Sequence, residues 1–280
     1  MQAPESVLVG RVTAVYWPGQ EVFATALAEL ADGAVTWPGL PAPWVAPMRL
    51  IVAPDKITFD SITRGRLPEW GIGVAIPRNN TIVLSADPQS RQTLQHELAH
   101  LALRSAVRRA PLWFQEGYAS RAADEWGRLD ALLVNWAVVW RRAPSLDRVN
   151  ALLREGPSGA KAGYALATTA VLHLERIGGD RGLGPLIAAL GSTSDLDRAL
   201  RQAHGMSVDQ FETDWRRDVR RRYGWLRVFT SFTVLWTITG LAVVGIWYRR
   251  RIRERERRIR LDDGLDLVEP SVTDDDTPSS

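Results

Sequence analysis

Two histidines four positions apart, followed by a glutamate beyond a proline, constrain the fold of this 280-residue chain more than any other feature. His96 and His100 lie within residues 88–109, where the apolar spacing predicts a helix, so both side chains project from one helix face. Glu116 follows His100 by sixteen residues, and Pro111 lies between them. Because proline interrupts a helix, we expect two helices that fold back on each other and bring Glu116 to the histidines.

These side chains predict a catalytic metal site. Two imidazole nitrogens and one carboxylate oxygen are typical zinc ligands, and they leave one tetrahedral position open for water. The sequence contains no cysteine, which excludes thiolate ligands, disulfides and a cysteine nucleophile. Glu97 is placed to act as general base on a zinc-activated water. Tyr164 is our candidate for the donor that stabilises the oxyanion, with a purely structural position in the core as its alternative.

The surrounding segments resemble a known family. HELAHL and PLWFQEGYAS are similar to the peptidase-MA-like gluzincins, which are HExxH…E zinc metallopeptidases related to thermolysin at the metal site. The resemblance covers residues 15–224 and is most specific over 85–120. It implies zinc bound by His96, His100 and Glu116, with Glu97 as the catalytic base. It also implies that residues 81–85, TIVLS, form an edge strand beside the cleft, able to pair with an extended substrate.

The sequence departs from that family at one position. Many gluzincins carry an aspartate one turn after the third ligand, where it contacts a zinc-binding histidine, whereas this chain has Ser120. Because such contacts orient the ligands, we expect either Ser120 or another carboxylate, such as Asp124, to take this role. The two remaining histidines are interpreted as non-ligands: His173 as packed or partly exposed on a helix, and His204 as capping a helix end or facing solvent there.

The apolar patterns predict an α+β fold, a thermolysin-like zincin domain with a small N-terminal mixed sheet and a mostly helical C-terminal part. Strands are expected at 48–53, 73–77 and 81–85, the last two joined by a hairpin turn. Helices are expected at 19–31 and 55–65, and then through most of the chain after Ser85. These later helices are predicted at 88–109, 112–125, 128–142, 145–154, 162–177, 180–190, 195–203 and 207–222.

Residues 228–248 form a run of 21 uncharged residues. At about 1.5 Å per residue, a helix of this length spans roughly 30 Å, the hydrocarbon thickness of a bilayer. Trp225, Trp247 and Tyr248 lie at its ends, where such side chains favour the membrane interface. We therefore predict one C-terminal transmembrane helix, with a buried core helix as the alternative. The predicted organisation is a metallopeptidase domain at 1–224, the transmembrane helix at 225–248, and a basic juxtamembrane segment with a disordered acidic tail at 249–280.

Charge bears on partners and location. The net charge of +3 is too small to indicate nucleic-acid binding. Residues 249–260 contain eight arginines and residues 216–227 contain six. The positive-inside rule therefore favours a cytoplasmic C-terminus and a single-pass protein with its catalytic domain outside the cytoplasm. Residues 1–19 lack a signal-peptide pattern, which leaves open whether a leader precedes them.

The sequence thus predicts a membrane-anchored zinc metallopeptidase that hydrolyses peptide or protein substrates with a zinc-activated water. The alternative is a non-catalytic scaffold of the same fold that binds zinc or peptides. The presence of Glu97 favours the peptidase, because a scaffold has no need of a general base.

Overall fold

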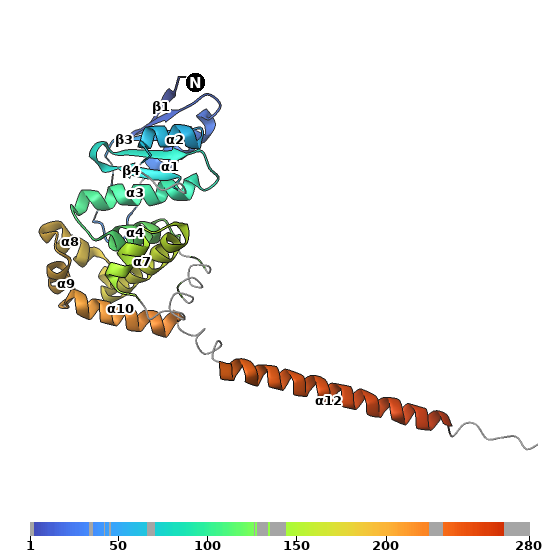
Figure 1. Cartoon of the computed structure of the whole chain (residues 1–280). Coiled ribbons are helices and arrows are strands. Elements are labelled where there is room, and N and C mark those ends of the chain that lie inside the picture. Colours follow the sequence, from blue (N-terminus) through green and yellow to red (C-terminus); the bar gives the residue numbers. More distant parts are fainter. Residues whose placement is uncertain are drawn as a thin grey trace, which may run out of the picture. The chain divides into compact units, whose positions relative to one another are not determined.

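The computed structural model describes residues 3–33, 36–41, 43–44, 46–65, 71–125, 127, 134, 144–223 and 232–265. The chain divides into two compact units, Met1–Leu226 and Arg227–Ser280. The first unit contains a sheet with helices packed on it and a helical part that follows (Figure 1). This is the mixed α+β arrangement, with a small N-terminal sheet and a mostly helical remainder, that the sequence predicts.

The sheet has five strands in the order β1-β2-β3-β5-β4. β1 pairs with β2 and β4 with β5 in antiparallel hairpins, whereas β3 lies between β2 and β5 and is parallel to both. Of these strands, the sequence analysis predicts β3, β4 and β5 but not the first hairpin, whose turn contains Gly10 with a φ of 53°. The strands are β1 (Glu5–Val9), β2 (Val12–Tyr16), β3 (Met48–Ala53), β4 (Gly73–Ile76) and β5 (Thr81–Ser85).

The predicted place of the TIVLS strand at the sheet edge is wrong. β5 pairs with β3 on one side and with β4 on the other, so its backbone groups are used on both sides. Its first four residues are buried, as in a central strand covered on both faces. The edge belongs to β4, because the chain forms β4 first and then turns back at Pro77–Asn79 to place β5 inside.

The helices of the first unit follow the predicted pattern, with shifted ends. α3 begins two residues later than predicted and ends earlier, because Val107 has an extended backbone. The helix predicted at 128–142 lies outside the described residues apart from Val134, which is helical. The described helices are α1 (Glu21–Asp32), α2 (Lys56–Thr63), α3 (Ser90–Ala106), α4 (Leu112–Ala122), α6 (Leu146–Leu152), α7 (Pro157–Ile177), α8 (Gly184–Thr193), α9 (Leu196–His204) and α10 (Val208–Tyr223), with a further 3₁₀ turn at Gly179–Arg181.

The packing of α4 against α7 positions α4, the helix that carries Glu116. Trp113, Phe114 and Tyr118 of α4 are fully buried. Gly117 packs directly against α7, because a Cβ atom there would lie 2.4 Å from the Ala167 carbonyl oxygen. The absence of a side chain at this position therefore lets the two helices pack closely.

The second unit contains α12 (Phe232–Leu265). The first four residues of the predicted transmembrane segment 228–248 lie outside the described residues. Within the described ranges, no helix combines the length and apolarity needed to cross a membrane. The predicted transmembrane helix is thus not supported by this part of the chain.

Candidate metal centre

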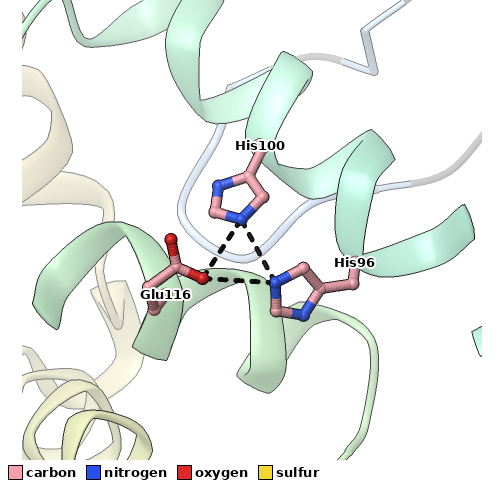
Figure 2. A group of neighbouring side chains, drawn as sticks. All are labelled: His96, His100 and Glu116. Carbon is pink, nitrogen blue, oxygen red and sulfur yellow. Dashed lines mark hydrogen bonds and ion pairs between the residues drawn. The ribbon is translucent and has the colours of Figure 1, made fainter. Parts of the chain in front are cut away.

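Three side chains from α3 and α4 converge on one point, as Figure 2 shows. The Nε2 atoms of His96 and His100 are 3.1 Å apart. The Glu116 Oε2 atom lies 3.5 Å from each of these nitrogens. Among the described residues, this is the one group of three or more histidine and acidic side chains whose ligand atoms all lie within 4.8 Å of one another. The structure therefore brings the three sequence-predicted ligands together.

Contacts in the first half and in the middle of α4 hold Glu116 towards α3. At the N-terminal end, the Trp113 backbone N–H donates to Asn150 Oδ1 at 2.9 Å, and Gln115 Nε2 donates to the Ala110 carbonyl at 2.7 Å. One turn later, the Tyr118 hydroxyl donates to the Pro38 carbonyl at 3.0 Å. Because the apolar side of α4 is buried in the core and the helix is tied at these points, Glu116 is left on the side that faces the histidines.

A fourth side chain, Glu125, orients His96. Both carboxylate oxygens of Glu125 lie 3.1 Å from His96 Nδ1. An Nδ1–H that donates to this carboxylate leaves the Nε2 lone pair directed at the ligand group. The sequence predicts either Ser120 or another carboxylate, such as Asp124, in this role. Another carboxylate does contact His96, but it is Glu125 and not Asp124, which is exposed.

The position of Glu125 depends on the end of α4. Asp124 has a φ of 52°, a left-handed conformation, and the Glu125 backbone N–H donates to the Ser120 carbonyl at 3.0 Å. This turn sends Glu125 back towards α3. No helical periodicity predicts a contact made after the helix has ended, so the sequence analysis misses this residue.

Burial and charge perturb the acidic groups of the site in opposite directions. Glu97 is 9% exposed, and burial raises its pKa, although His100 and His96 partly oppose this effect. Burial also acts to raise the pKa of Glu116, but hydrogen bonds from His100 and His96 outweigh it and lower that pKa well below its usual range. Glu116 is therefore ionised, as a metal ligand must be, while Glu97 has the higher proton affinity that suits a base.

A pocket of about 290 Å³ opens onto these side chains. Tyr164 of α7 lines it, and its ring centroid lies 6.1 Å from that of His96. Burial raises the pKa of the Tyr164 phenol, and the negative charges of Glu116 and Glu97 raise it further, so the hydroxyl keeps its proton. The other lining residues are Gly73, Val74, Ala75, Pro77, Glu97, His100, Leu103, Arg104, Val107, Ala110, Gln115, Glu116 and His96.

The other two histidines lie away from this centre. His173 Nδ1 is 3.6 Å from Asp218 Oδ2 on α10, and its ring packs against Phe211. His204 lies at the end of α9, where burial lowers its pKa. Neither belongs to the ligand group, although the His204 side chain is partly buried and not simply solvent-facing.

A mixed sheet, a helical remainder and a His–His–Glu group on two successive helices define a metallopeptidase-like domain. The family model of the Peptidase MA superfamily matches residues 60–221, more than half of the chain, and the chain therefore belongs to this superfamily. This finding confirms the resemblance to gluzincin peptidases.

One solved structure with which the chain shares similarity is a two-domain M1 zinc metallopeptidase mutant bound to L-tryptophan. The identity is 18%, and the TM-score is 0.42. The match covers 75% of this chain and 50% of that structure, so the chain spans half of its length. None of the curated proteins compared with the chain matches it significantly.

Proposed function

We propose that this chain is a zinc-dependent peptidase that hydrolyses peptide bonds in the pocket between β4, α3, α4 and α7. The observation that carries the proposal is the convergence of His96, His100 and Glu116, with Glu97 beside them in the same pocket. Membership of the Peptidase MA superfamily supports the proposed reaction class.

The residues at this centre fit zinc. They offer two imidazole nitrogens and one carboxylate oxygen, which is the donor set of a zinc site with one position left open. The Glu125 carboxylate at His96 Nδ1 completes the arrangement, because histidine ligands of zinc commonly donate their other N–H to a carboxylate. A structural zinc site would need a fourth protein ligand, and the group contains three.

Each side chain then has a defined task. Zinc, when bound, would supply Lewis-acid chemistry by lowering the pKa of a water and polarising a carbonyl group. Glu97 would accept the proton of the attacking water and return it to the leaving nitrogen. Tyr164, protonated and lining the pocket, would donate a hydrogen bond to the oxyanion.

The free edge of β4 would position the substrate. β4 pairs with β5 alone among the described strands, and Gly73, Val74 and Ala75 line the pocket. An extended peptide can therefore add to this edge through backbone hydrogen bonds and lie across the ligand group. β4 takes the role that the sequence analysis gives to the neighbouring strand.

The test measures zinc content and hydrolysis of a broad peptide library by the full chain and by its Glu97→Gln variant. We expect one zinc per chain in both proteins. The variant should cleave about 10²–10⁴ times more slowly, because it lacks the base. Zinc in both proteins with cleavage by neither would favour the non-catalytic scaffold, and equal cleavage by both would contradict the role of Glu97.

Membrane anchoring and a catalytic domain outside the cytoplasm also form part of the proposal. Their support is the uncharged run at 228–248 and the arginine distribution on its two sides. Cell fractionation of the full chain and of residues 1–224, followed by protease treatment of intact cells, tests both. Recovery of the full chain free of membranes would overturn the anchor, and protection of the domain inside intact cells would overturn its location.

A further inference from the structure

The pocket wall contains a cation that the proposed chemistry does not use. Arg104 of α3 lines the pocket and is exposed. It follows His100 by one helical turn, about 6 Å along the axis, on the same helix face. The ion pairs formed among the described residues do not include it.

The charges in this pocket are separated along α3. The carboxylates of Glu97 and Glu116 lie at the end of the pocket that contains the ligand group, beside the histidines. At the other end, Arg104 lies among apolar wall residues, Leu103 and Val107. A guanidinium on an apolar wall forms strong paired hydrogen bonds with a carboxylate when a ligand supplies one.

A structural role does not account for the place of Arg104. A cation in the last turn of a helix interacts favourably with the helix dipole, and a position on the solvent side of α3 would serve that purpose equally. Arg91, near the other end of the helix, is exposed and does not line the pocket. The pocket-facing position thus suggests a ligand for Arg104.

The geometry points to Arg104 as a specificity residue that binds a carboxylate of the substrate. The proposed substrates are therefore peptides with an acidic group near the scissile bond. Because an extended peptide advances about 3.3 Å per residue, this group lies within the first few residues from that bond. It is either an acidic side chain or the C-terminal carboxylate. This inference rests on the proposed peptidase function.

The test uses matched peptides that carry Glu, Gln or Lys at each position in turn, with free or amidated C-termini. The full-length wild type, Arg104→Gln and Arg104→Glu proteins are compared, with Arg91→Gln as the control. We expect the wild type and the control to prefer peptides with one carboxylate. Arg104→Gln should lower kcat/KM for these by about tenfold, the loss of one charged contact, and leave neutral peptides within about twofold.

The peptide pairs identify the source of the carboxylate. Loss of the preference on amidation would assign the C-terminus, and loss on Glu to Gln replacement would assign a side chain. Arg104→Glu should favour the Lys peptides instead. An equal effect of Arg104→Gln on all peptides, or no wild-type preference for a carboxylate, would overturn the inference.

A binding measurement separates this inference from the proposed function. Fluorescently labelled peptides are titrated into zinc-loaded Glu97→Gln and into the Glu97→Gln/Arg104→Gln double variant. Tighter binding of carboxylate-bearing peptides to the first protein alone is expected, whether or not the wild type cleaves any of them. With no cleavage, that result would contradict the peptidase and still support Arg104. Equal binding to both proteins, or binding to neither, would overturn the inference.

Discussion

In the described part of the first unit, two histidines, His96 and His173, have a carboxylate beside Nδ1, and of these two His96 belongs to the metal-ligand group. His96 Nδ1 lies 3.1 Å from Glu125, and the opposite ring nitrogen faces His100 and Glu116. His173 Nδ1 lies 3.6 Å from Asp218. Asp218 is already held by Arg176 and Arg222, at 2.7 and 2.8 Å. Both histidines thus have a carboxylate beside Nδ1. At His173 this carboxylate is shared with two arginines, whereas at His96 the opposite ring nitrogen faces the other two ligands.

The difference shows that the site is defined by three ligand atoms that lie close together, and not by the residue types alone. At His96 three ligand atoms from two helices lie close together, and the Glu125 carboxylate accepts the hydrogen bond of Nδ1, the ring nitrogen outside the ligand group. At His173 the carboxylate is neutralised by two guanidinium groups, and burial, the largest influence on the imidazole, lowers its pKa. The second cluster is therefore a partly buried ion-pair network between α7 and α10 and not a ligand group.

The largest predicted contrast is in zinc-dependent stability. A ligand that binds only the folded state at a free concentration 1,000 times its Kd stabilises it by about 4 kcal/mol. We expect zinc to raise the free energy of unfolding of the wild type and of His173→Ala by this amount, and to leave His96→Ala unchanged. Chemical denaturation with zinc and with a chelator measures this effect. Loss of the zinc effect in His173→Ala would break the distinction between the two clusters.

A smaller contrast concerns the two carboxylates. Removal of a carboxylate that orients a histidine ligand typically weakens metal affinity about 10–100-fold. We expect this loss for Glu125→Gln and none for Asp218→Asn, measured by zinc competition with a chromogenic chelator. Equal zinc affinity in Glu125→Gln and the wild type would show that the contact at His96 does not tune the site.

The smallest predicted effect comes from a substitution that displaces α4, and with it Glu116, without replacing a ligand. A Cβ atom at Gly117 would lie 2.4 Å from the Ala167 carbonyl oxygen, so α4 must move away from α7. We expect Gly117→Ala to cost about 1–3 kcal/mol of stability and to weaken zinc binding, because Glu116 is the preceding residue.

The matched control for this change is Gly184→Ala, where the nearest heavy atom to the added Cβ is 3.6 Å away. Such a substitution should change stability by no more than about 0.5 kcal/mol. Denaturation and zinc titration of both variants provide the comparison, and identical behaviour of the two would contradict the role of close α4–α7 packing.

The ligand residues whose positions depend on helix periodicity and on the proline break are predicted from the sequence. The i, i+4 spacing places His96 and His100 on one face of α3, and Pro111 marks the break after which α4 returns with Glu116. The role of Glu125 is not predicted, because its position depends on Asp124, which has a left-handed backbone conformation after the end of α4.

Strand positions are also more predictable than strand neighbours. Apolar runs identify β3, β4 and β5, but the order of a sheet depends on how the connections cross. The resulting error is the edge position predicted for β5, since the edge belongs to β4. The buried run at β5, TIVL, was the available signal for a central strand.

The most direct test of the proposed zinc centre is anomalous X-ray diffraction at the zinc edge from crystals of the zinc-loaded chain. We expect one anomalous peak about 2.0–2.2 Å from Nε2 of His96, Nε2 of His100 and a carboxylate oxygen of Glu116. No peak at this point, or a peak at His173 and Asp218 instead, would contradict it.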